Sequence, residues 1–161
     1  MSGIRVSMAG QFEEYKERLQ RLGSIDRAEL MAAIAEALRT STDERFDTET
    51  SPDGVAWKRS IRASGGGKTL TDRSHLRTSI HARSSEKGAE IGTNTIYAAT
   101  HQFGDPGRTI RAKNKRMLAF QIGGKWYHKK QVTIKIPARP FLGLSDADRT
   151  EIIELMEEAL T

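Results

Sequence analysis

The sequence predicts an α+β fold, with N-terminal helices, a mainly antiparallel sheet that includes a long basic hairpin, and a C-terminal helix. Three observations predict it. Apolar residues recur at helical spacing in residues 11–46 and again in residues 146–160. Residues 132–136, VTIKI, alternate between apolar and polar side chains, as a half-exposed strand does. The two glycines at residues 123–124 mark a tight hairpin turn.

Length and composition indicate one domain. The chain has 161 residues and 37% hydrophobic residues, so we expect a single domain over residues 1–161 with a modest core. Within it we expect flexible segments at about residues 1–10, 63–69 and 104–116. The chain contains no cysteine, which excludes disulfides and thiol chemistry. No apolar run approaches the ~20 residues of a membrane helix, and no signal-peptide core is visible, so we expect synthesis in the cytoplasm and no membrane partner.

The charges are strongly segregated along the chain. Residues 56–144 hold 18 basic and 4 acidic residues, whereas residues 1–55 hold 7 basic and 11 acidic ones, and residues 145–161 hold 1 basic and 6 acidic ones. Two acidic ends therefore flank a very basic middle. Such asymmetry favours a charged partner, which is nucleic acid, an acidic protein surface or the acidic ends of a neighbouring copy.

The N-terminal third is predicted to be helical. A first helix is expected over residues 11–22, where Gly23 ends it. Asp26 and Glu29 form a capping box that begins a second, core-facing helix, which runs to about residue 40 or 46. After this helix comes a turn at residues 52–54, Pro-Asp-Gly, and then Trp57, which we expect to pack against the helices as an anchor.

The basic middle is predicted to alternate between short helices and strands. We expect a short helical segment over about residues 71–80, then two strands at residues 81–84 and 89–92. Asn94 is placed to cap a brief helix over residues 95–102.

The segment that follows predicts a projecting hairpin. Residues 104–115 are rich in glycine and basic residues and predict a mobile arm or a long hairpin loop. The strands at residues 117–122 and from residue 125 onwards then pair across the Gly-Gly turn.

Residues 136–144, IPARPFLGL, join this sheet to the last helix. The two prolines fix their own φ angles and cannot donate to a sheet, so the segment ends a strand and forms a stiff rod. One interpretation is that Phe141 and its neighbours fix the last helix onto the sheet. A second is that Arg139, held between the prolines, is presented to a partner. Ser145 and Asp148 form the capping box of the C-terminal helix, which we expect to end near residue 160.

Two motifs carry a resemblance to a known family. The runs are YAATHQFG at residues 97–104 and IPARPFLG at residues 136–143, with further matches in order at Pro52-Asp53-Gly54 and Trp57, at residues 70–80, and at Ile91-Gly92-Thr93-Asn94. Together they resemble the phage virion morphogenesis family, the tail completion proteins of tailed bacteriophages and prophages. The resemblance covers about residues 45–160. It implies a small structural protein at the junction of head and tail, and not an enzyme.

Catalytic, cofactor and metal sites are not predicted. The run GGGKT at residues 65–69 suggests a phosphate-binding loop, but that loop needs a glycine where Arg62 stands. The four histidines lack the spacing of a helical zinc site, and no cysteine is present to help. The few carboxylates of the basic middle are scattered, so no acid and base pair is indicated.

The predicted partner interface combines the two motifs with the basic arm. For His101 we favour a hydrogen bond to a backbone group that braces the turn at Gly104, with direct partner contact as the alternative. The interface residues are Tyr97, His101, Gln102, Phe103, Arg108, Arg111, Lys113, Lys115, Arg116, Lys129, Lys130, Arg139 and Phe141.

The favoured hypothesis is a virion protein of the tail or neck, assembled in the bacterial cytoplasm, that completes or terminates the tail and joins it to the head. It would act as a homo-oligomer, in a ring that contacts other tail or neck proteins. Acidic surfaces of the last helix, from Glu151, Glu154, Glu157 and Glu158, would meet the basic hairpin of the next copy. The alternative is a DNA-binding module that uses the same basic residues on phosphates. A hydrolase is the least favoured.

Overall fold

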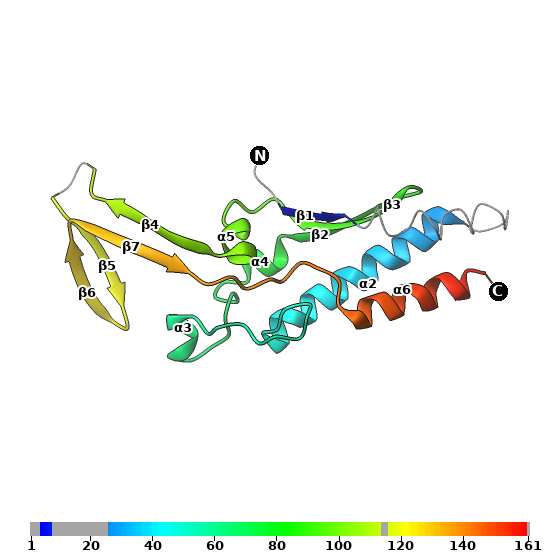
Figure 1. Cartoon of the computed structure of the whole chain (residues 1–161), viewed down its shortest axis with the longest axis horizontal. Helices are drawn as coiled ribbons and strands as arrows, with labels where there is room; N and C mark the ends of the chain where they lie inside the picture. The colour runs from blue at the N-terminus through cyan, green and yellow to red at the C-terminus, as the bar shows by residue number, and fades with distance from the viewer. Residues whose placement is uncertain (1–3, 8–25, 114–115, 161) are drawn as a thin grey trace.

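The computed structural model describes residues 4–7, 26–113 and 116–160, and it confirms an α+β fold with antiparallel sheets. Figure 1 shows an elongated molecule. Helix α2 (Arg27–Thr48) and helix α6 (Asp146–Glu158) lie side by side at one end, and an arm of β-strands extends from the other.

Local signals set the bounds of both long helices. The Asp26 carboxylate accepts hydrogen bonds from the backbone N–H groups of Ala28 and Glu29, at 3.0 and 3.1 Å, and so caps α2. The predicted capping is confirmed for Asp26, but not the return bond from the Glu29 side chain. The capping box of Ser145 and Asp148 begins α6, also as predicted. The helix predicted over residues 11–22 lies outside the described residues.

A three-stranded antiparallel sheet covers one side of α2. Its order is β1 (Ile4–Ser7), β3 (Gly88–Thr93) and β2 (Ile80–Ser85), and the paired β2 and β3 are the two strands predicted at residues 81–84 and 89–92. The first strand corrects the expectation of a flexible segment at residues 1–10, because residues 4–7 pair with β3. The pairing partner lies more than 80 residues away along the chain, so no local signal predicts it.

The core lies between this sheet, α2 and α6. Phe46 at the end of α2 is fully buried, and its ring contacts those of Trp57 and Phe141 at centroid distances of 5.5 and 5.6 Å. The indole Nε1–H of Trp57 donates to the carbonyl of Pro140 at 2.8 Å, so Trp57 is the anchor that was predicted. The IPARPFLG run at residues 136–143 is therefore attached to the helical end of the molecule.

Three short helices complete the fold: α3 (Ile61–Ser64) and α4 (His75–Thr78) lie between α2 and β2 in the chain, and α5 (Ala98–Phe103) leads into the arm. Helix α5 begins later than predicted. Tyr97 occupies its N-cap position, without a side-chain hydrogen bond, in place of Asn94. Helix α3 occupies the start of the segment 63–69 that was expected to be flexible.

The arm consists of two antiparallel pairs of strands. Strands β4 (Asp105–Arg111) and β7 (Gln131–Ile136) form a ribbon, and β5 (Leu118–Ile122) and β6 (Lys125–Lys129) form a hairpin at its far end (Figure 1). The expectation of a flexible segment at residues 104–116 is therefore wrong for residues 105–111. This strand contains a proline and a glycine and lacks alternation, so only its pairing with β7 identifies it.

Candidate interaction surface

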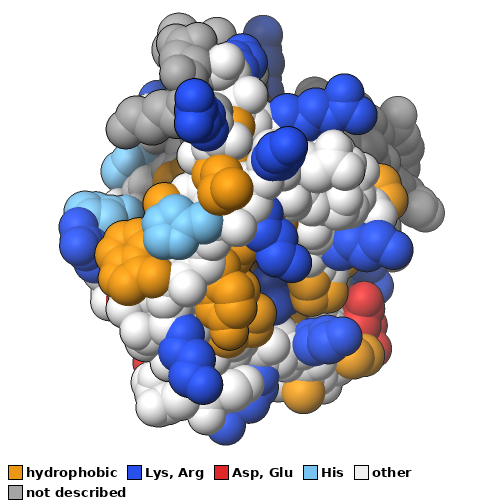
Figure 2. Space-filling model, turned by 90° about the vertical axis from the view of Figure 1, so that its left-hand side faces the viewer, with side chains coloured by type: hydrophobic (Ala, Val, Ile, Leu, Met, Phe, Trp, Pro, Cys, Tyr) orange, Lys and Arg blue, Asp and Glu red, His pale blue; other side chains and the backbone are white. Residues whose placement is uncertain are grey.

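The arm presents most of the predicted basic residues to solvent. Every residue of β6 is exposed, as are all residues of β4 after Asp105. Figure 2 views this end of the molecule, where Lys and Arg side chains surround hydrophobic ones and little acidic surface is visible. The exposed members of the predicted interface are Tyr97, Phe103, Arg108, Arg111, Lys113, Arg116, Lys129 and Lys130. Lys115 lies outside the described residues.

The arm also exposes apolar side chains. On one face of the hairpin the ring of Phe120 stacks on that of Tyr127 across the strands, at a centroid distance of 5.8 Å. Ile122 on the same face is 42% exposed, and Trp126 on the other face is 65% exposed. A two-stranded hairpin is at best marginally stable on its own in water. This combination of charge, aromatic surface and thin structure is typical of a segment that is covered by a partner.

The residues that fix the arm to the core correct two interface predictions. Phe141 is fully buried in the core, so it is not available to a partner. Gln102 is also buried: its Oε1 accepts from the backbone N–H groups of Phe141 and Leu142, each at 3.0 Å, and its Nε2 donates to the Leu142 carbonyl at 2.7 Å. Gln102 thus joins α5 to the segment after β7. Its side-chain amide makes the hydrogen bonds that a neighbouring strand would otherwise make to the backbone of residues 141–142.

Arg139 is buried and does not lie on the exposed surface of the arm. Only 6% of it is exposed, and its Nε–H donates to the carbonyl of Lys58 at 2.7 Å. Its backbone N–H donates to the carbonyl of His101 at 2.7 Å. The flanking prolines give the segment a fixed path, as predicted, but that path runs across the body of the molecule, so the side chain points inward.

His101 does not make the predicted side-chain hydrogen bond to a backbone group. Its Nδ1 is buried without a partner among the described residues, and its ring meets that of Tyr97 edge to face at 5.9 Å. Burial, and then the nearby charge of Arg139, lowers the pKa of His101 below its usual value. Both effects favour the neutral form of the imidazole.

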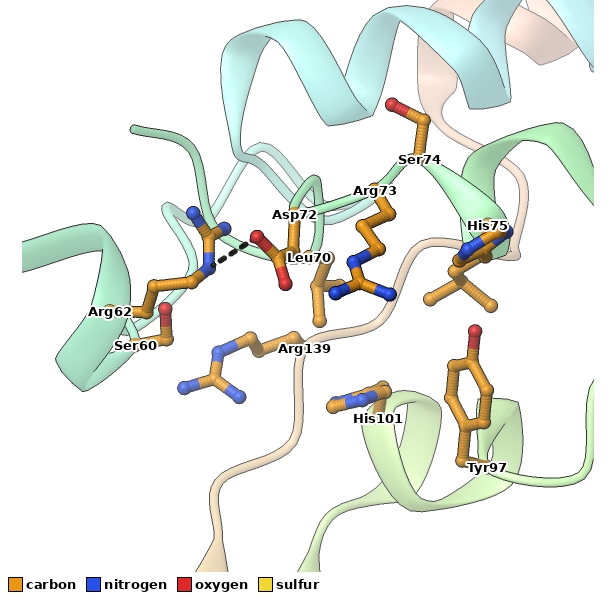
Figure 3. Close-up of a pocket in the computed structure, with 11 residues that line it drawn as sticks. Ser60, Arg62, Leu70, Asp72, Arg73, Ser74, His75, Tyr97, His101 and Arg139 are labelled. Atoms are coloured by element: carbon orange, nitrogen blue, oxygen red, sulfur yellow. Dashed lines mark ion pairs between the residues drawn. The ribbon is translucent and has the colours of Figure 1, made fainter. Parts of the chain in front are cut away.

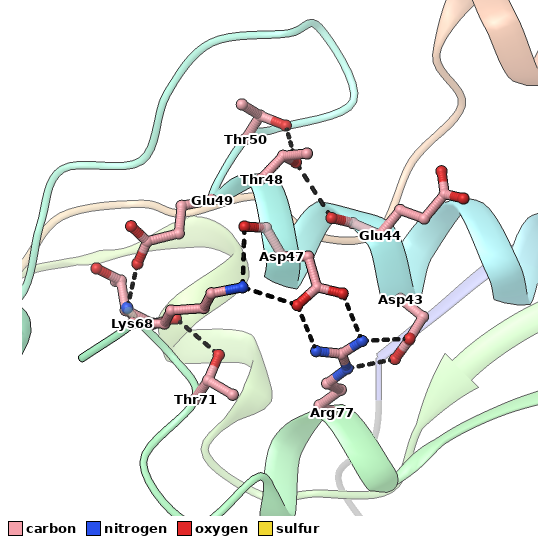
Figure 4. A network of polar contacts seen from close by, with 10 residues as sticks. Asp43, Glu44, Asp47, Thr48, Glu49, Thr50, Lys68, Thr71 and Arg77 are labelled. Carbon is pink, nitrogen blue, oxygen red and sulfur yellow. Dashed lines mark hydrogen bonds and ion pairs between the residues drawn. The ribbon is translucent and has the colours of Figure 1, made fainter.

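A network of ion pairs and hydrogen bonds fixes Lys68, Thr69 and helix α4 against the end of α2 (Figure 4). The Lys68 ammonium lies 2.8 Å from a carboxylate oxygen of Asp47, and the Thr69 N–H donates to the Glu49 carboxylate. Arg77 of α4 bridges Asp47 and Asp43. Hydrogen bonds from Arg77, joined at Asp47 by one from Lys68, keep the pKa values of both aspartates below their usual range. These contacts hold one wall of a pocket beside the arm.

That pocket was not predicted. It is lined by arginines and histidines from α3, α4, α5, the loop before α4 and the segment after β7, which converge only in the folded chain (Figure 3). Arg62, Arg73 and His75 are the members that the sequence analysis did not assign. No local signal distinguishes them, because their common feature is a shared space and not a spacing along the chain.

Two observations concern other kinds of site. Within the described ranges, no group of three or more His, Asp and Glu side chains is placed to hold a metal ion. None of the described helices is both long and apolar enough to span a membrane.

Comparison with known proteins identifies relatives over nearly the whole chain. The model of the phage virion morphogenesis family matches residues 9–161. Mu-like prophage FluMu G protein 2 of Haemophilus influenzae is 31% identical, over 98% of this chain and 95% of that protein. The putative capsid assembly protein G of Escherichia phage Mu is 27% identical, over 89% of this chain and 86% of that protein. No solved structure gives a significant match.

Proposed function

The chain belongs to the phage virion morphogenesis family, and from this membership and the form of the arm we propose that it is a structural subunit that completes the phage tail by assembling into a ring. The ring sits at the tail end or neck of the virion, where it contacts other tail or neck proteins. One relative is named for capsid assembly. A subunit at the head–tail junction meets the head as well as the tail, so that name agrees with the proposed location.

The proposal rests mainly on the structure of the arm. It exposes Trp126, Ile122 and a row of cations on a structure only two strands wide. A long ribbon with exposed apolar side chains is stabilised when a second subunit covers it. Cyclic contacts between identical subunits also match the symmetry of a tubular tail.

Charge segregation supports a contact between different patches of two copies. The arm is basic, whereas the exposed face of α6 bears Glu151, Glu154 and Glu157. A contact of α6 with the arm of the next copy would join unlike surfaces, which is the arrangement that generates rings. The role requires no catalytic residue and no cofactor.

The proposal is tested with the purified full-length protein. We expect rings in electron micrographs, and a sedimentation coefficient well above that of a monomer. Trp126→Ala should weaken assembly while the melting temperature of the subunit stays close to that of the wild type. Val55→Ala is the matched control, because Val55 is 66% exposed but lies outside the arm. Assembly should also weaken in ~1 M salt, where the screening length is ~3 Å. A wild-type protein that stays monomeric at all concentrations and salt levels contradicts the ring.

The exposed cations of the arm favour DNA contact as a second candidate function. Phosphate binding by several lysines and arginines releases counterions, so affinity for duplex DNA should fall steeply as salt rises. Fluorescence anisotropy with a labelled duplex at ~50 mM salt measures it. Absence of binding under that condition removes this candidate and leaves the ring unaffected.

A further inference from the structure

The pocket beside the base of the arm has a volume of about 340 Å³, which is near the lower end of the range for ligand pockets. Its charged and aromatic lining includes Arg62, Arg73, His75, Tyr97, His101 and Arg139. Figure 3 shows these side chains arranged around one common space, with the ion pair of Arg62 and Asp72 on one side. The space is large enough for one or two side chains of a partner.

Arg139 is a buried cation in this pocket. Its side chain is more than nine-tenths buried, and no described carboxylate forms an ion pair with it. The single hydrogen bond from Nε to Lys58 leaves four of the five guanidinium N–H groups without a partner among the described residues. The Nη groups are not among the fully buried atoms that lack a partner in the described part of the chain, so they reach the open space of the pocket, where an entering anion can accept hydrogen bonds from them.

The rest of the lining adds positive charge. Asp72 is the acidic residue of the pocket, and Arg62 pairs with it at 3.6 Å. Arg73 is exposed at the pocket and forms no ion pair with a described residue. Two of the three guanidinium groups are therefore unneutralised, and the buried Nδ1 of His101 also has no partner among the described residues. The pocket is chemically suited to a carboxylate or a phosphate.

The lining also includes two residues in an uncommon backbone conformation. Leu70 and Ser74 have φ angles of +61° and +57°, in the left-handed region that residues other than glycine, asparagine and aspartate seldom occupy. Such conformations persist only where the surrounding structure enforces them, and they concentrate at functional sites. Just before Leu70 in the chain, Lys68 bonds to Asp47 at the end of α2, and the Thr69 N–H donates to the Glu49 carboxylate.

We propose that this pocket receives a glutamate side chain from helix α6 of a second copy of the chain. The inference rests on the proposed ring and adds the place where neighbouring subunits engage. Helix α6 presents Glu151, Glu154 and Glu157 on its exposed side, at the three-residue spacing that places them on one face. None of these three carboxylates forms an ion pair with a described residue.

A second copy fits better than other sources of the anion. One chain carries both an unneutralised cationic pocket and an unpaired acidic row, on different elements. Complementary patches of this kind produce head-to-tail contacts, which close into rings. A DNA phosphate shares the anion chemistry, but the cations that face outward on the arm are easier for a duplex to reach than a buried guanidinium. Phosphate binding is therefore an outcome that the test must distinguish.

The first test removes charges from the pocket. Arg73→Gln and Arg139→Gln should each weaken self-association by about tenfold or more in sedimentation velocity, because each removes a charge-assisted contact. Arg83→Gln is the matched control, since Arg83 is an exposed arginine on β2 outside the pocket. Arg73 is exposed, so its variant remains informative even if Arg139→Gln fails to fold.

The second test identifies the partner element. Because the chain has no cysteine, any disulfide that forms must involve the single cysteine introduced in each variant. His75→Cys at the pocket should form disulfide-linked dimers with Glu151→Cys, Glu154→Cys or Glu157→Cys when the two proteins are mixed and mildly oxidised. Glu36→Cys, on the exposed face of α2, should not. Mass spectrometry of the linked peptides locates the contact.

The outcomes separate the inference from the proposed function. A wild-type protein that never assembles overturns both. Wild-type assembly that Arg73→Gln and Arg139→Gln weaken no more than Arg83→Gln does, with no disulfide to α6, overturns the inference and leaves the ring standing. Variants that assemble normally but lose affinity for duplex DNA assign the pocket to phosphate, and that result also overturns the inference.

Discussion

Arg45 and Asp148 form a buried ion pair that joins helix α2 to the first turn of α6. Both side chains are almost fully buried, at 6% and 3% exposed. The same guanidinium donates to the carbonyls of Phe141 and Gly143, at 3.1 and 3.0 Å. One arginine thus fixes α2, the segment after the arm and the C-terminal helix in a single arrangement, and the acidic face of α6 depends on it for its position.

Removing one member of this pair should strongly destabilise the subunit. We expect Asp148→Asn to lower the free energy of unfolding by about 3 kcal/mol, because it leaves the Arg45 charge buried without its counter-ion. Urea unfolding followed by circular dichroism measures the loss. Asp146→Asn is the matched control, because Asp146 lies two residues away on the same helix and is fully exposed, so its change should be small. Equal losses for the two variants would contradict the structural role of the buried pair.

Stability should fall in acid, since several carboxylates titrate below their usual range. Hydrogen bonds from Arg77 lower the pKa of Asp43. For Asp148 burial raises the pKa, but hydrogen bonds from Ser41 and Ser145 and the charge of Arg45 outweigh it and leave the pKa lowered. The unfolded chain therefore binds more protons as the pH falls. The stabilisation is complete above about pH 5 and is lost as the pH falls through the folded values.

Melting temperatures measured from about pH 7 to about pH 2 test this dependence. Asp148→Asn should give a shallower curve than the wild type, because it removes one of the titrating groups. A wild-type melting temperature that stays constant down to about pH 3 would contradict the lowered pKa values of these carboxylates in the folded protein.

The turn between α5 and the arm depends on Gly104. Its φ is +78°, and a Cβ there would lie 2.8 Å from the Ala138 nitrogen and 2.9 Å from the Ile136 oxygen. Gly104→Ala should therefore suffer both backbone strain and a clash. Gly54→Ala is the control: Gly54 has a φ of +75° but open space around its Cβ position. We expect about 1 kcal/mol of destabilisation for Gly54→Ala and clearly more for Gly104→Ala, by urea unfolding. Equal losses of unfolding free energy in the two variants would mean that the contact of the new Cβ with residues 136 and 138 costs nothing.

Local signals explain why much of the fold is predictable from the sequence. Caps at Asp26 and Ser145 define where α2 and α6 begin, and the glycine pair at residues 123–124 defines the hairpin. Strand β4 has no such signal. Its residues are almost all exposed, and its pairing with β7 is set by contacts across the chain.

The candidate site was less predictable, because a sequence motif does not show which of its side chains are buried and which are exposed. The YAATHQFG run was interpreted as interface, and the IPARPFLG run either as packing for the last helix or as a segment that presents Arg139 to a partner. Each run supplies buried residues that hold the base of the arm. Gln102 and Phe141 contact each other within the subunit, whereas Tyr97 and Phe103 are exposed. Burial follows from how α5 lies against the segment after β7, and that arrangement involves residues about 40 positions apart.

Gln102 and Phe103 test which motif residues hold the subunit together and which are free to contact a neighbour. They are adjacent in the chain, but Gln102 is buried and Phe103 is exposed. Gln102→Leu removes three hydrogen bonds to the backbone of residues 141–142 and leaves those buried groups unsatisfied. We expect it to cost about 2–4 kcal/mol of unfolding free energy, because each unsatisfied buried group is expensive. Phe103, at 71% exposed, should tolerate Phe103→Ala with little change in unfolding free energy, while self-association weakens if α5 faces a neighbour. If instead Gln102→Leu folds as stably as the wild type and loses only assembly, Gln102 is a contact residue, and the segment after the arm is held by other means.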